Sequence, residues 1–142
     1  ITLGSNPAVC SGATSANLTY SATTNSPDQY SIDYNAAANT AGFTDVTNAT
    51  LPASPIVLTV PGGAAAGTYN ATLTVRNSTT GCVSAVSNIS VTINSLPQGS
   101  ITGNTICEGG TGQFTFTASS GTGPFTLIIN GTTYNSVTSG VA

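Results

Sequence analysis

The sequence predicts an all-β protein made of β-sandwich domains in tandem, the second of them incomplete. Short runs of Val, Ile, Thr and Tyr recur between turns rich in Gly, Pro, Asn and Ser, which is the composition of strands and hairpin loops. Apolar and polar residues alternate within these runs, as they do in half-buried strands. The chain also repeats itself with a period of about 96 residues, which suits one sandwich domain.

Charged residues are scarce, and this limits the classes of partner. Of the 142 residues, 39% are hydrophobic and 4% are charged. The single cation is Arg76, and the acids are Asp28, Asp33, Asp45 and Glu108. Nucleic-acid binding and attraction to an anionic membrane surface both need clustered Lys and Arg. Neither partner is therefore expected.

The longest apolar runs, such as Pro55 to Val60, have the length of a strand and fall far short of a bilayer span, so membrane insertion is not expected. The chain begins without Met and without a basic segment that leads into an apolar one. We therefore expect an internal or processed segment of a longer protein. A neutral surface of Ser, Thr and Asn, with almost no sites for trypsin-like proteases, favours an extracellular or cell-surface location.

Residues 1–94 have the pattern of one sandwich domain with roughly six or seven strands. After an opening segment over residues 1–10, the expected strands cover residues 16–22, 29–34, 56–60, 68–76 and 83–93. Residues 35–54 are weakly patterned, and a short strand is expected there at 43–46. Alternation predicts inward side chains at Leu18, Tyr20, Tyr69, Ala71, Leu73, Val75, Ile89, Val91 and Ile93.

Residues 95–99 are expected to form a short linker, because Pro97 limits flexibility and strand pairing. Residues 100–142 then form the N-terminal part of a second domain, with strands at 113–118, 125–130 and 132–137. Asn130-Gly131 predicts a two-residue hairpin turn. This half-domain cannot bury a stable core alone. We expect the natural chain to continue, the alternative being that another molecule supplies the missing strands by edge addition.

The second domain repeats residues of the first. Cys107, within the segment Thr105 to Gly109, takes the place of Cys10 within Ala8 to Gly12. Apolar residues of the following two strands also match, after a gap of one residue: Leu18 and Tyr20 with Phe114 and Phe116, and Tyr30, Ile32 and Tyr34 with Phe125, Leu127 and Ile129. The repeat predicts that the two domains share one fold.

Two short motifs resemble a known class of repeat. Gly67 to Asn77 begins with Gly-Thr-Tyr and leads through a polar hairpin to Gly81-Cys82. The segment Ile101 to Gly110 has the form in which such repeats begin. Both are similar to the PKD-like and Ig-like repeats of very large Bacteroidota surface proteins, including the gliding-motility adhesins. The likeness covers essentially the whole chain.

This resemblance implies tandem Ig-like or PKD-like sandwich domains within a secreted multidomain parent, exported through the type IX pathway and displayed on the cell surface. It implies a stalk or fibre role. The partners are then neighbouring repeats of the same protein, with surface glycans or other cells as further candidates.

One disulfide is expected among the three cysteines. We expect Cys10 and Cys82 to be bonded, although a residue at the end of the first strand need not lie near the last hairpin. Cys107 would have its partner beyond the end of the chain. The alternative is three reduced, buried thiols. No metal site is expected, since the chain has no His and no Cys-x-x-Cys pair.

Three aromatic residues receive specific predictions. Tyr69 opens the penultimate strand of the first domain, where sandwich domains often keep a tyrosine whose hydroxyl bonds back to the preceding loop; a plain core tyrosine is the competing interpretation. Phe43 and Tyr134 fall outside the alternating inward positions. They are therefore the candidate ligand contacts, because carbohydrate-binding modules use exposed aromatic platforms.

No catalytic site and no cofactor are expected. Asp28 and Asp33 could be a glycosidase pair, but Asp28 lies in a Pro turn and Asp33 alternates outward, which favours a solvated surface. A weak calcium site near Asp28 or Asp45 is a minor alternative. The chain has no His or Lys to serve as a base for a nucleophile. Gly62-Gly63 and Gly109-Gly110 precede no helix pattern and are interpreted as turns.

The leading hypothesis is therefore a non-enzymatic structural repeat segment, a stalk or fibre part of a secreted bacterial cell-surface adhesin. A carbohydrate-binding module is the first alternative. The second is a polymerising fibre subunit, in which a neighbouring molecule completes the half-domain by strand exchange.

Overall fold

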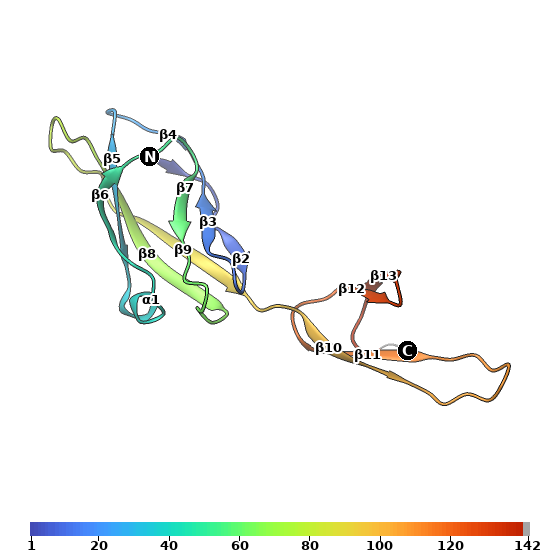
Figure 1. Ribbon diagram of the computed structural model, residues 1–142. Helices are drawn as coiled ribbons and strands as arrows, with labels where there is room; N and C mark the ends of the chain where they lie inside the picture. The colour runs from blue at the N-terminus through green and yellow to red at the C-terminus, as the bar shows by residue number, and fades with distance from the viewer. Residues whose placement is uncertain (141–142) are drawn as a thin grey trace. The chain divides into compact units, whose positions relative to one another are not determined.

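The computed structural model describes residues 1–140 and shows an all-β, sandwich-type protein, as the sequence predicts. The chain divides into two compact units, unit 1 from Ile1 to Asn94 and unit 2 from Ser95 onward. Figure 1 shows the two units along the chain. Each is described below by itself.

Unit 1 is built on a five-stranded sheet with the strand order β2-β9-β8-β5-β6. Strand β2 runs parallel to β9, and the other neighbours are antiparallel. The strands are β2 (Ala8–Cys10), β9 (Ser87–Asn94), β8 (Gly67–Arg76), β5 (Gln29–Tyr34) and β6 (Val46–Thr50).

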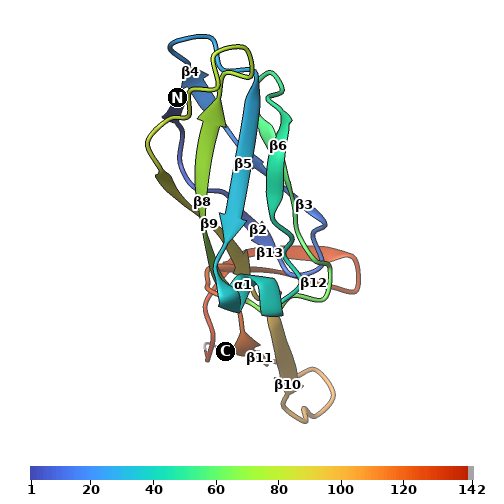
Figure 2. The ribbon, with the colours of Figure 1, turned by 90° about the vertical axis from the view of Figure 1, so that its left-hand side faces the viewer.

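A second layer closes the core of unit 1. It consists of two antiparallel pairs: β3 (Ser15–Leu18) with β7 (Ile56–Thr59), and β1 (Thr2–Leu3) with β4 (Tyr20–Ala22). Figure 2 shows β5 and β8 in front of β3. Leu18 and Ile56 from this layer share one buried cluster with Ile32, Leu73 and Val91 from the five-stranded sheet. The two layers therefore enclose a single hydrophobic core.

Strand β8 shows how the sequence pattern produces this core. Ala71, Leu73 and Val75 are buried, while the Thr residues between them are only partly covered. Successive side chains of a strand point to opposite faces, so alternation places one apolar row against the second layer. The inward positions predicted for β8 and β9 are confirmed, and Tyr69 and Tyr20 are half-buried at the edge of the core.

The segment 35–54 differs from the prediction. It contains a short helix, α1 (Ala36–Thr40), and its strand β6 lies at Val46–Thr50 instead of 43–46. Asn35 caps the helix by accepting a hydrogen bond from the Ala38 amide at 2.9 Å. Gly42, with a φ of 99°, follows the helix in the left-handed region that favours glycine.

Two expected strands of unit 1 are also different in extent. The strand predicted over residues 16–22 is divided at Thr19 into β3 and β4, which pair with different partners. The strand predicted from residue 83 begins at Ser87, and Val83 forms only an isolated bridge with Arg76. The alternation continues through both interruptions, which is why the sequence did not reveal them.

Unit 2 contains two antiparallel hairpins, β10 (Gln98–Gly103) with β11 (Phe114–Ser120) and β12 (Phe125–Ile129) with β13 (Thr132–Val137). Phe116 and Phe125 are the buried residues of its described part, and their rings meet edge to face with centroids 5.2 Å apart. Positive φ angles at Asn130 and Gly131 confirm the predicted two-residue turn. The expected linker 95–99 is shorter than predicted, because β10 already begins at Gln98.

The units share details of register that the sequence repeat did not specify. In unit 1, Tyr30 pairs with Ala49 and Ile32 with Val46, so the partner strand carries one extra residue. In unit 2, the matching Phe125 and Leu127 pair with Val137 and Tyr134 across the same irregularity. In both units a residue with positive φ lies within this irregularity, Asn48 in β6 and Ser136 in β13. The hairpin β12–β13 is therefore the counterpart of β5–β6.

Truncation of Leu73, at the centre of β8, tests the importance of this core. Leu73 is fully buried, so Leu73→Ala removes packing on both sides of the core and should lower the free energy of unfolding of unit 1 by about 2–5 kcal/mol. Val57→Ala is the matched control, because Val57 is 59% exposed; its cost should stay within about 0.5 kcal/mol. Urea unfolding measures both. Equal costs for the two variants would contradict the core described above.

Candidate functional site

The predicted disulfide is absent: Cys10, Cys82 and Cys107 are all free and exposed. Cys10 pairs with Asn94 at the end of β9. Cys82 lies in the loop between β8 and β9, beside the bridge from Val83 to Arg76 at the opposite end of the sheet. β8 has ten residues, and at about 3.3 Å per residue its ends lie roughly 30 Å apart. A disulfide requires Cα atoms within about 7 Å, so the prediction was wrong.

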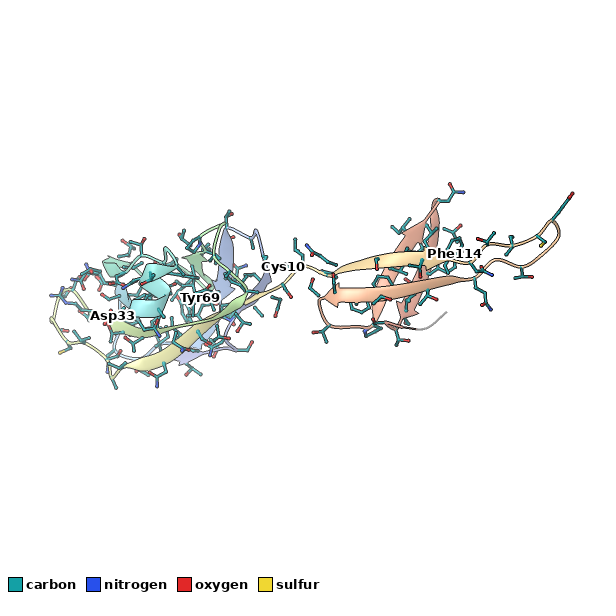
Figure 3. All side chains as sticks on the ribbon, turned by 90° about the horizontal axis from the view of Figure 1, so that it is seen from below. Cys10, Asp33, Tyr69 and Phe114 are labelled. Carbon is teal, nitrogen blue, oxygen red and sulfur yellow. The ribbon has the colours of Figure 1, made fainter. Side chains whose placement is uncertain are left out.

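Tyr69 makes the hydrogen bond expected of a tyrosine corner. Its hydroxyl donates to the carbonyl oxygen of Ala65 at 2.8 Å, four residues upstream. The ring itself is half-buried and packs on Phe43 with ring centroids 4.7 Å apart. Figure 3 labels Tyr69 on its strand. The residue therefore ties the loop before β8 to the sheet and contributes to the core at the same time.

Phe43 is a core residue, which corrects its prediction as a ligand contact. It is 3% exposed and lies between the rings of Tyr34 and Tyr69. Its amide donates to the carbonyl of Ala38 at 3.1 Å, so the turn after α1 directs the side chain inward. Alternation could not locate Phe43, because it belongs to neither a strand nor the helix. Burial also raises the pKa of its neighbour Tyr34 to about 12, with smaller contributions from Tyr30 and Asp45.

Tyr134 is 49% exposed, and it lines an open groove of unit 2. Side chains from all four strands of the unit form a groove of about 620 Å³ there. We call it the apolar groove. Its apolar lining residues are Ile101, Phe114, Phe116, Leu127, Ile129, Tyr134 and Val137, and Gln113, Asn135, Ser136 and Thr138 also line it. Sequence reasoning placed Tyr134 on the surface but did not find the groove. The exposure of the other lining residues depends on which strands pack over them, and alternation within one strand does not report that.

Asp28 and Asp33 are not brought together as a catalytic pair. Asp28 precedes β5 and Asp33 lies near its other end, which at about 3.3 Å per residue is a separation of roughly 17 Å. Glycosidase carboxyl groups lie about 5–9.5 Å apart. Asp33 is exposed, as predicted, and Figure 3 labels it on the sheet. The pair therefore does not have the geometry of a glycosidase site.

Asp28 and Asp45, the acids considered for calcium, each make hydrogen bonds within unit 1. Asp28 accepts from the hydroxyl of Ser78 and from its amide, the latter at 2.7 Å. Asp45 accepts from the amide of Tyr34 at 2.8 Å. Within residues 1–140, no three or more His, Cys, Asp and Glu side chains gather where they could hold a metal ion.

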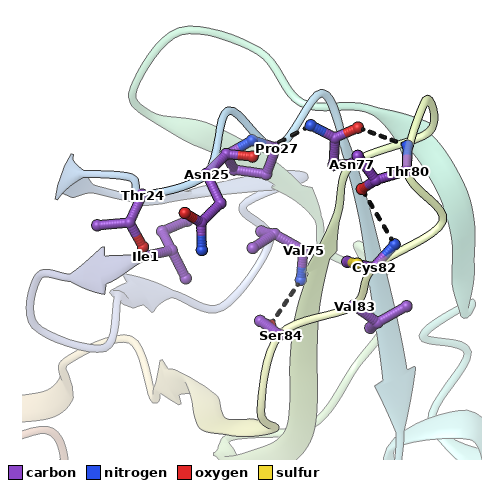
Figure 4. A pocket seen from close by; sticks show the side chains of 10 residues that line it. All are labelled: Ile1, Thr24, Asn25, Pro27, Val75, Asn77, Thr80, Cys82, Val83 and Ser84. Carbon is purple, nitrogen blue, oxygen red and sulfur yellow. Dashed lines mark hydrogen bonds between the residues drawn. The ribbon is translucent and has the colours of Figure 1, made fainter.

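Asn77 holds two loops of unit 1 together, and sequence reasoning missed this role. Its side-chain nitrogen donates to the carbonyls of Asn25 and Ser26 at 3.1 and 3.0 Å, and its oxygen accepts from the amides of Thr79 and Thr80. Figure 4 shows these loops around a hollow of about 420 Å³. The position of Asn77 at the start of a polar loop was the available signal, because Asn often bonds the backbone of such turns.

Comparison of the chain with protein families and with curated proteins finds no match. Within the described residues 1–140, no helix has the length and apolar content needed to cross a membrane. The apolar groove of unit 2 and the polar loops of unit 1 are the candidate functional surfaces.

The link from Asp28 to Ser78 predicts a pH dependence. The hydrogen bonds from the Ser78 hydroxyl and amide hold the pKa of Asp28 below its usual value of 3.8. A lowered pKa stabilises the folded state above pH 3.8, and this contribution is lost as the pH falls through the lowered pKa. Asp28→Asn should therefore lower the thermal midpoint of unit 1 at neutral pH, and the difference from wild type should disappear in strong acid.

Thermal unfolding followed by circular dichroism between about pH 7 and pH 2 measures this difference. Asp33→Asn is the control, since Asp33 is an exposed carboxylate on β5, the strand that follows Asp28. A difference between wild type and Asp28→Asn that stays constant over the whole range would contradict the role of the ionised carboxylate.

Proposed function

We propose that this chain is a structural repeat segment, part of the stalk or fibre of a secreted bacterial cell-surface adhesin with Ig-like or PKD-like domains, and that it performs no catalysis. The observation that carries the proposal is the repeated register of the two units, including the irregularity shared by β5–β6 and β12–β13. Repeats in series extend a chain from its attachment point. A neutral, polar surface suits this role, because its contacts depend little on salt.

The pairing of β2, the second strand of unit 1, with its last strand β9 suits a chain under tension. β2 and β9 run parallel, and β9 ends at Asn94, where the chain leaves the unit. Tension pulls the start of β2 and the end of β9 in opposite directions. In a parallel pair this loads all the connecting hydrogen bonds together, including Ser11 N to Asn94 O at 2.8 Å and Thr92 N to Pro7 O at 3.0 Å.

This arrangement makes a mechanical prediction. Ser11 and Pro7 bond to β9, so alternation directs the amide of Val9, midway between them, toward β9 as well. Val9→Pro removes that donor and should lower the force at which unit 1 unfolds when the chain is pulled by its ends. Cys10→Pro is the control, because the amide of Cys10 points away from β9. Single-molecule force spectroscopy compares them, and equal unfolding forces would argue against a tension-bearing role.

Location is tested on cells that produce the natural protein. Antibodies raised against the 142-residue chain should label intact cells, and brief protease treatment of those cells should remove the label. Labelling of permeabilised cells measures the total. Label that appears only after permeabilisation would reject the cell-surface proposal, whatever the mechanical result.

The carbohydrate-binding alternative has weaker support. Of its two aromatic contacts, Phe43 lies in the core and Tyr134 is on the surface. Tyr134 shares the apolar groove with aliphatic and Phe side chains. Polar side chains also line the groove, at Gln113, Asn135, Ser136 and Thr138. A mixed lining of this kind suits an extended polypeptide, whose alternate side chains and backbone can use both kinds of group.

A further inference from the structure

Strand β12 of unit 2 has an open edge. Within residues 95–140, β12 pairs with β13 alone. Its counterpart in unit 1, β5, pairs with β6 on one edge and with β8 on the other. Because β12–β13 repeats the register of β5–β6, the open edge of β12 corresponds to the edge of β5 that β8 occupies.

The side chains beside this edge are uncovered in unit 2 and covered in unit 1. Leu18 is fully buried, whereas the matching Phe114 is 60% exposed; Figure 3 labels it on β11. Leu127 and Ile129 are half-buried, although the matching Ile32 and Tyr34 are core residues. These uncovered residues line the apolar groove defined above. In unit 1, β8 fills the edge beside β5, and its Ala71, Leu73 and Val75 belong to the same buried cluster as Leu18, Ile32 and Tyr34.

The neighbouring edge of unit 2 is already in use by the chain itself. After β13, the amide of Gly140 donates to the carbonyl of Phe116 at 2.8 Å, and Ser139 accepts from the amide of Ala118 at 2.9 Å. In unit 1, the chain after β6 similarly reaches Tyr20, the counterpart of Phe116, through Ser54. The outer edges of β10, β12 and β13 have no strand partner in the described part of unit 2. Among them, the edge of β12 is the one whose counterpart in unit 1 is paired, by β8.

We propose that the open edge of β12 and the apolar groove bind a free, extended segment of the β8 type, which pairs antiparallel with β12. The required chemistry follows from β8: apolar side chains at every second position, as at Ala71, Leu73 and Val75, and short neutral side chains between them. Charge is not needed, because residues 95–140 carry Glu108 as their one charged side chain. This inference rests on the comparison of the two units and is independent of the surface role proposed above.

An intact second copy of this chain is not the occupant. In a folded unit 1, β8 is paired on both edges, with β5 and with β9. Donating it would dismantle the core of the donor. The segment that binds is therefore one that is not already part of a complete sheet, and strand addition then supplies backbone hydrogen bonds while the groove accepts alternate side chains.

The test uses the full 142-residue chain and a synthetic peptide with the sequence of residues 67–77. The amides that should become protected can be named from unit 1. Tyr34 donates toward β6 and Asn35 toward β8, so alternation directs the amides of Ser31 and Asp33 toward β8. Their counterparts are Thr126 and Ile128. Hydrogen exchange followed by NMR should slow at least about tenfold at these two amides in the presence of peptide.

Three comparisons make the result decisive. A peptide with Thr72→Pro lacks the amide that pairs with Asp33 in unit 1, the counterpart of Ile128, and should give no protection. Phe114→Ser in the chain should weaken binding without unfolding unit 2, because Phe114 is largely exposed. The amides of β5, already covered by β8, should not change and serve as an internal reference.

Absence of protection at Thr126 and Ile128 at about 1 mM peptide would overturn the proposal. So would equal protection by the Thr72→Pro peptide, or protection confined to β10 and β11. If the chain alone formed dimers with slowed exchange at Thr126 and Ile128, the occupant would be a second copy, which also contradicts the proposal.

Discussion

The structure of unit 1 depends on strand β8, which has a partner strand on each edge and packs its inward face into the core. Its edges are taken by β5 and β9, and its inward face carries Leu73 at the centre of the core. Backbone groups on both edges are thereby satisfied, and apolar side chains are removed from water in the same step. The other elements are arranged around this strand: β3 and β7 cover its inward face, and Tyr69 fixes the loop that leads into it.

Unit 2 illustrates the same constraint by contrast. Its two hairpins repeat the register of unit 1, yet only Phe116 and Phe125 are buried in it. A strand pair can adopt its local geometry from turn residues and alternation, because the Asn130-Gly131 turn and the irregularity before Val137 are local features. A core cannot form locally, since it needs a second layer. The apolar groove is the direct consequence of a sheet whose central strand is not present among residues 95–140.

Alternation made much of this fold predictable, because it reports which side chains of a strand face the core. It located β5, β7, β8 and the inward row of β9, and the composition of the turns located the hairpin at Asn130. It could not locate Phe43, whose burial is decided by a helix cap at Asn35 and by two rings that come from other strands. The disulfide failed for a related reason. The repeat relates Cys10 to Cys107, but it carries no information on which end of the sheet holds Cys82, and strand direction places the two thiols at opposite ends.

The scarcity of charge leaves the loops of unit 1 to be held by neutral groups and by the carboxylates of Asp28 and Asp45. Asn77 and Asp28 bond directly to backbone groups of the facing loop, and both lie at the end of the sheet remote from Asn94. The parallel pairing of β2 with β9 lies at the end near Asn94. Tension applied at the ends of unit 1 shears the β2–β9 pair, whereas thermal unfolding responds to both regions. Mechanical strength is therefore assigned to one end of the sheet and equilibrium stability to both ends, so a substitution near Asn77 need not change the unfolding force.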